Sequence, residues 1–66
     1  MSVAKVIEIS SSSTQSFEDA IQEGLRRAES SLKHVKGAWI SEQKVDYADG
    51  KITAFRVNMK VTFVID

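Results

Sequence analysis

The sequence predicts an α+β fold: a three-stranded antiparallel sheet wrapped around one helix, with the elements in the order β-α-β-β. From Phe55 to Phe63, apolar residues alternate with polar ones, as in a strand that buries one face. An apolar stripe with helical spacing runs from Phe17 to Leu32. Asp49-Gly50 separates two strand-like segments and favours a tight hairpin. Residues 1–66 are expected to form one domain, because a chain of 66 residues supports a single small core.

The first predicted strand runs from Val3 to Ile9, a segment rich in β-branched residues. The run Ser10 to Ser13, followed by Thr14, is predicted to be a polar loop, since hydroxyl side chains favour turns over regular pairing. The sequence therefore places a loop between this strand and the helix.

The helix is expected to begin after Ser16, a good N-cap, with Asp19 three residues on as in a capping box. Glu23 and Arg27 are four residues apart, in the order that favours an ion pair on a helix surface. Gly24 lies on the apolar stripe, where its lack of a side chain would allow close approach to the sheet.

The C-terminal end of the helix is predicted from its charges. Lys33, His34 and Lys36 suit the negative end of the helix dipole, and Gly37 is expected to end the helix. The predicted helix would then extend past Leu32.

Two strands follow, from Ala38 to Tyr47 and from Lys51 to Ile65, joined by a type I′ turn at Asp49-Gly50. A helical crossover makes the first and second strands parallel, whereas the hairpin makes the second and third antiparallel. Both conditions are met by an antiparallel sheet of order 1-3-2. The face away from the helix is then expected to associate with other subunits. Its apolar members are Val6 or Ile7, Ile40, Ile52 and Val64.

Composition excludes several classes of protein. There is no cysteine for disulfides, and His34 is the single histidine, so a zinc site is not expected. Nine basic and nine acidic residues give zero net charge, which argues against nucleic-acid binding. Apolar runs are too short to cross a membrane, and no secretion signal is recognisable, so a cytoplasmic location is expected. Self-association remains as the means of stabilising so small a core.

Several segments taken together resemble the dodecins. They are K-V-I-E-I before a serine-rich segment, A-I-x-x-G-x-x-R-A in the helix, an E-Q pair, and a closing F-x-V-x-M-K-V-x-F. The resemblance implies a β-α-β-β fold and a hollow spherical homododecamer. It also implies a non-catalytic role in flavin storage, with riboflavin, FMN or FAD bound at contacts between subunits. In such sites flavin rings stack between tryptophans, and a glutamine of the third strand holds the ring edge.

The sequence departs from this pattern at the residues that would bind flavin. The stacking tryptophan falls at Gly37 and the ring-edge glutamine at Arg56, whereas Trp39, two residues after Gly37, is the one tryptophan. Gly37, Trp39 and Arg56 are therefore the candidate ligand-binding residues. A related branch of the dodecins lacks that tryptophan and is described as calcium-binding, which makes a flavin-free structural or calcium-binding role the alternative.

Two interpretations stay open for each candidate. Trp39 either stacks on a ring in place of the missing tryptophan or packs in a subunit contact. Arg56, on one face with Asn58 and Lys60, either binds an anionic ligand or pairs with an acidic residue of a neighbouring subunit. The acidic residues considered for that pair are Glu8, Glu42 and Asp46.

Calcium ligands are not identifiable from the sequence. Glu42, Asp46, Asp49 and Asp66 offer carboxylates, but without the spacing of an EF-hand. Catalysis is not expected, because His34 stands alone and the serine run has no recognisable base beside it.

Overall fold

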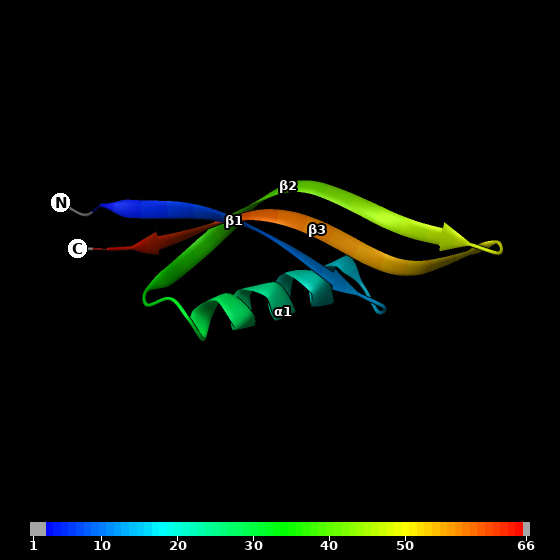
Figure 1. Ribbon diagram of the computed structural model, residues 1–66, viewed down its shortest axis with the longest axis horizontal. Helices are drawn as coiled ribbons and strands as arrows, with labels where there is room; N and C mark the ends of the chain where they lie inside the picture. Colours follow the sequence, from blue (N-terminus) through cyan, green and yellow to red (C-terminus); the bar gives the residue numbers. More distant parts are fainter. Residues whose placement is uncertain (1–2, 66) are drawn as a thin grey trace.

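A computed structural model describes residues 3–65 and shows one helix against one face of a three-stranded sheet (Figure 1). The strands are β1 (Ala4–Ser13), β2 (Val35–Ala48) and β3 (Lys51–Val64), and the helix is α1 (Phe17–Glu29). The sheet order is β1-β3-β2, with both pairs antiparallel. The predicted fold class, element order and sheet topology are therefore confirmed.

The central strand β3 supplies most of the core. Val57, Met59 and Val61 are buried against the helix together with Ala20. The alternation from Phe55 onward thus has the physical cause that the sequence indicates, one face covered and one face open. Half-buried apolar residues surround this cluster: Ile7, Ile9, Phe17, Ile21, Leu25, Ala28, Val35 and Ala38.

Strand β1 is longer than predicted, because the serine run is part of it. Ser10 to Ser13 pair with β3 from Asn58 back to Phe55, so the predicted loop at these serines is wrong. Pairing wins over turn propensity because β3 offers unpaired backbone groups along this whole length. Ser11 of this segment lies against the helix at Gly24. A Cβ added at Gly24 would lie 3.0 Å from the Ser11 Cβ and 2.5 Å from the Met59 methyl carbon. The predicted close approach of Gly24 to the sheet is confirmed.

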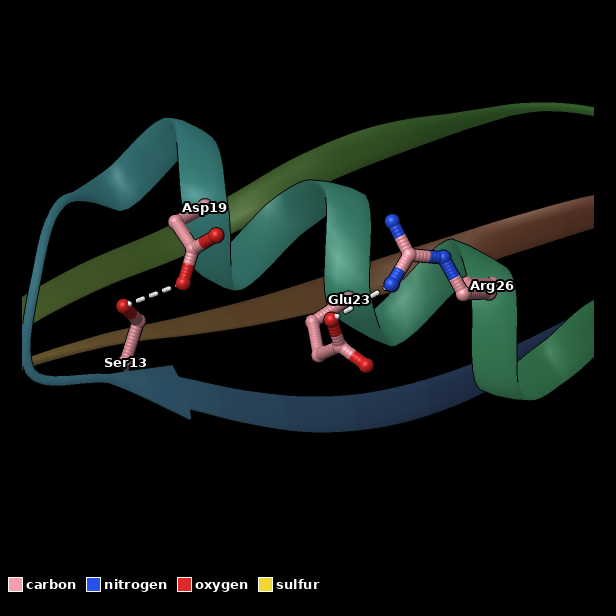
Figure 2. A network of polar contacts seen from close by, with 4 residues as sticks. All are labelled: Ser13, Asp19, Glu23 and Arg26. Atoms are coloured by element: carbon pink, nitrogen blue, oxygen red, sulfur yellow. Dashed lines mark hydrogen bonds and ion pairs between the residues drawn. The ribbon is translucent and has the colours of Figure 1, made fainter.

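The helix begins where the sequence places it. The backbone N–H of Asp19 donates to the Ser16 Oγ at 2.9 Å. The Asp19 carboxylate accepts from the Ser13 hydroxyl at 2.7 Å, a contact that ties the end of β1 to the first turn of α1 (Figure 2). On the helix surface Glu23 pairs with Arg26 at 3.0 Å, and not with Arg27 as the spacing predicts (Figure 2).

The predicted end of the helix is wrong. Helix α1 stops at Glu29 with Ser30 as its C-cap, and the chain reverses at His34, whose φ is 61°. The carbonyl of His34 accepts a hydrogen bond from the Val64 N–H, so pairing with β3 begins directly after the reversal. Gly37 consequently lies inside β2 and does not end the helix.

The hairpin turn is confirmed, since Asp49 and Gly50 have φ values of 53° and 76°. Strand β1 ends at Ser13, opposite Phe55, so the β2–β3 hairpin continues beyond it as a two-stranded ribbon. Figure 1 shows this ribbon projecting past the helix, and the molecule measures 51 × 19 × 13 Å. None of the helices in the described part of the chain is long and apolar enough to span a bilayer.

Candidate functional site

The candidate residues lie on the face of the sheet turned away from α1, called the outer face below. On β3, Arg56, Asn58 and Lys60 alternate with the buried residues and therefore share this face, as predicted. Strand β2 adds Trp39 opposite Lys60 and Glu42 opposite Asn58. The outer face thus combines basic, acidic and aromatic side chains along the length of the hairpin.

Within residues 3–65, two contacts between side chains connect β2 to β3 on this face. The Arg56 Nε donates to the Asp46 Oδ2 at 2.8 Å. The Asn58 Nδ2 donates to the Glu42 Oε1 at 2.9 Å. Arg56 therefore has an acidic partner within its own chain, so an anionic ligand would compete with Asp46 for the guanidinium.

Gly37 and Trp39 lie on the same face, opposite Thr62 and Lys60 respectively. A Cβ at Gly37 would meet nothing within 4 Å, so the backbone leaves room for a side chain there. The Trp39 side chain is 64% exposed and available to stack on a ring or on another subunit. The structure thus places Gly37 and Trp39 side by side on β2.

Arg56 lies far from Gly37. Thr62, the partner of Gly37, is six residues from Arg56 along β3, which is about 20 Å of extended strand. One small ring cannot touch both positions of the same subunit. A ligand contacting both would have to lie between subunits, as the resemblance to dodecins implies.

Two adjoining shallow hollows lie on the outer face between β1 and β2. The first has a volume of about 430 Å³ and is lined by Glu8, Ile9, Ser10, Glu42 and Asn58. The second, of about 310 Å³, is lined by Ser10, Glu42, Gln43, Lys44, Arg56 and Asn58. Together they form a surface rich in oxygen atoms around Glu42.

Residues 3–65 of one chain do not form a complete calcium site. Within residues 3–65, no three His, Cys, Asp or Glu side chains are grouped to hold a metal ion. Glu8 and Glu42 approach the same hollow, whereas Asp49 lies in the hairpin turn and Asp46 pairs with Arg56. Asp66, the remaining carboxylate considered, lies outside the described residues.

Sequence reasoning missed the irregularities in the pairing of β2 with β3 that build this surface. Strand β2 has one extra residue between Val35 and Gly37 and another between Ile40 and Glu42. At Asp46 and Tyr47 the extra residue, Thr53, is in β3. Ile40 follows Trp39 in regular alternation and lies opposite the buried Met59, on the helix side, so its predicted place on the outer face is wrong. The shift between Ile40 and Glu42 brings Glu42 onto the same face as Trp39, although the two positions are three apart and would otherwise alternate. The sequence carries no glycine or proline that marks this bulge.

Comparison with known proteins agrees with the fold. The dodecin family model matches residues 3–66, nearly the whole chain. The chain belongs to the dodecin family.

Its relatives include a calcium dodecin. The calcium dodecin of Mycobacterium tuberculosis is 43% identical over 65 residues, covering 96% of this chain and 89% of the relative. The solved structure of that calcium-chelating antigen, described as having a novel calcium-binding site, matches with a TM-score of 0.83 and 35% identity. That match covers 98% of this chain and 93% of the other. Dodecin from Streptomyces davaonensis matches with a TM-score of 0.92 and 29% identity, over 98% of this chain and 96% of the other.

Proposed function

We propose that this chain is the subunit of a non-catalytic, hollow homododecamer that binds calcium, with oxygen ligands contributed by more than one subunit. The observation that carries this proposal is the hollow on the outer face where Glu8 and Glu42 meet Ser10 and Asn58. Carboxylate, hydroxyl and amide oxygens are the ligands that calcium takes. The 43% identity to a calcium dodecin supports the same assignment.

Assembly is part of the proposal because one subunit offers too few ligands. Calcium takes about six to eight oxygens, whereas the hollow holds two carboxylates, and an oxygen of one of them, Glu42, already accepts from Asn58. The shape of the chain also favours assembly. Its accessible surface is 4900 Å², against about 4,200 Å² for a compact monomer of this mass. Its radius of gyration is 13.5 Å, against about 11 Å for a compact chain of this length.

Calcium binding is tested by titration calorimetry of the purified protein. Glu42→Gln and Glu8→Gln each remove a negative ligand from the hollow, and each is expected to weaken calcium binding about tenfold or more. Glu29→Gln, an exposed change at the end of α1, is the matched control and should leave calcium affinity unchanged. Wild-type protein that takes up no calcium would refute the calcium assignment.

The role of calcium in assembly is tested separately with a chelator. If the ion bridges subunits, its removal lowers the melting temperature or the mass seen by light scattering. Unchanged mass and melting temperature would leave calcium no structural part in the shell.

Flavin is the second candidate ligand, favoured by the exposed Trp39 beside Gly37 on β2. Quenching of flavin fluorescence on adding the protein would support it, and unchanged fluorescence at excess protein would exclude it. The double variant Gly37→Trp with Arg56→Gln restores both family residues. If these two positions weaken flavin binding, the double variant should bind flavin more tightly than the wild type.

A further inference from the structure

The end of the β2–β3 hairpin is not covered by any other part of the described chain. Residues 45–54, called the hairpin arm, begin at the pair Val45–Phe55, where β1 ends. Beyond that pair the sheet has two strands, and a two-stranded ribbon is marginally stable in water by itself. Within the arm, Tyr47 is 69% exposed and its direct partner Ile52 is 51% exposed. The arm therefore carries an apolar patch that requires a cover.

A groove of matching character lies elsewhere on the molecule. It runs between α1 and β1, has a volume of about 580 Å³, and is lined in part by Ile7, Ile9, Ala28 and Leu32. Glu23 and Arg27 of the helix also line it. The groove is the size of a typical ligand pocket, which is about 300–1,000 Å³, so it can take the side chains of a hairpin. It also follows β1, which is an edge strand of the sheet.

The arm cannot fill the groove of its own subunit, because it projects away from its own helix (Figure 1). A second copy of the chain can supply what is missing. The charges agree with this pairing, since the arm carries Asp49 and Lys51 at its turn and the groove carries Arg27 and Glu23. Asp49 can therefore pair with Arg27, whereas Glu23 is already paired with Arg26 of its own helix.

We propose that the hairpin arm of one subunit packs into the groove between α1 and β1 of the next subunit. Such a contact joins two different surfaces, and repetition around a rotation axis closes it into a ring. The apolar pair Tyr47 and Ile52 meets the apolar lining of the groove, and Asp49 lies near Arg27. This inference rests on the proposed self-assembly and specifies which surfaces carry it.

Cross-linking tests the contact directly, because the chain has no cysteine of its own. The full chain carrying both Lys51→Cys and Arg27→Cys is treated with a short bis-maleimide and run on a denaturing gel. If the arm of one subunit reaches the groove of the next, the links form a ladder of covalent dimers, trimers and larger species. The matched control carries Lys51→Cys with Lys60→Cys, which lies on the outer face and outside the groove.

The outcomes separate this contact from assembly in general. Shells of wild-type mass in which the groove pair links no better than the control would overturn the arm contact and leave the proposed function standing. A monomer by light scattering at micromolar concentration would overturn both.

A second measurement does not depend on the engineered cysteines. Tyr47→Ala and Leu32→Ala are each expected to raise the concentration at which half of the chain assembles by about tenfold or more. If the two side chains meet across subunits, the double variant should lose less than the product of the two single losses. Independent effects, with unchanged circular dichroism, would contradict the contact.

Discussion

The two ends of the hairpin differ in how they are stabilised. Near α1, β3 buries Val57, Met59 and Val61 against the helix and is flanked by strands on both sides. In the hairpin arm the same strand has one neighbour and no helix, and its apolar residues face solvent. The first half is a core of its own chain, whereas the second has the composition of an interface.

If the chain assembles as proposed, this difference lets so short a chain combine a stable fold with a binding surface. A domain of this size buries only about 60% of its unfolded surface, so its own core leaves little margin. Apolar groups placed outside that core, such as Tyr47 and Ile52, gain burial only in an assembly. The covered half is the part of the hairpin that packs on α1. Mutations that destabilise this half are thus expected to differ from mutations that weaken the packing of the hairpin arm.

The largest expected effect comes from breaking the covered half. Met59 is fully buried at the centre of the core. Met59→Ala leaves a cavity there and should lower the free energy of unfolding by about 2–5 kcal/mol. Urea denaturation followed by circular dichroism measures this loss. Met59→Leu conserves volume and should cost less than about 1.5 kcal/mol. A midpoint for Met59→Ala equal to that of the wild type would show that the helix does not seal this core.

A smaller effect is expected from the arm. Gly50 has a φ of 76°, and Gly50→Ala forces a side chain into that left-handed conformation at a cost of about 1–2 kcal/mol. If the arm is an independent unit, amide exchange in residues 45–54 should speed up about 5- to 30-fold. Exchange at Val57 to Val61 should stay unchanged.

Gly37→Ala is the matched control for this variant, because a Cβ at Gly37 meets nothing within 4 Å. It should leave exchange in the hairpin arm as it is. Faster exchange throughout the sheet in Gly50→Ala would show that the arm and the core unfold as one unit.

The helix cap belongs to the covered half and is expected to contribute about 1 kcal/mol. Ser16→Ala removes the acceptor for the Asp19 N–H and should lower the unfolding free energy by that amount. Ser31→Ala, an exposed change beyond the helix, is the control. An unchanged stability would mean that the Ser13–Asp19 contact holds the first turn without the cap.

The sequence predicts the covered half better than the outer face, for a physical reason. The alternation around Met59 and the Ser16 cap depend on local spacing, which a sequence displays. The Asp49-Gly50 turn, although it lies in the hairpin arm, is predicted for the same reason. The predicted end of the helix is wrong because the chain reverses at His34. The carbonyl of His34 accepts a hydrogen bond from Val64, a residue far away in the sequence, which local spacing does not reveal.

The polar contacts of the outer face could not be predicted for a similar reason. They depend on register shifts between β2 and β3 that no local residue type marks, such as the one that brings Glu42 opposite Asn58. The candidate residues Gly37, Trp39 and Arg56 follow from the resemblance to dodecins. Their ligand does not follow from it, because within residues 3–65 the chain brings Glu8 and Glu42 to one hollow but groups no three side chains that could hold a metal ion.

The smallest expected effect concerns the contact at the base of the arm. Arg56 and Asp46 lie 2.8 Å apart but are partly exposed, and such pairs contribute about 0.2–1 kcal/mol. A double-mutant cycle with Arg56→Gln and Asp46→Asn should give a coupling in that range, weakened by salt. The same cycle is then measured in the Tyr47→Ala background, at a concentration below that at which this variant assembles. If subunits cover the Arg56–Asp46 contact, the coupling should be larger and less sensitive to salt in the assembled protein than in this monomer. Equal couplings in the two states would show that the contact stays open to solvent and that the interface lies farther along the arm.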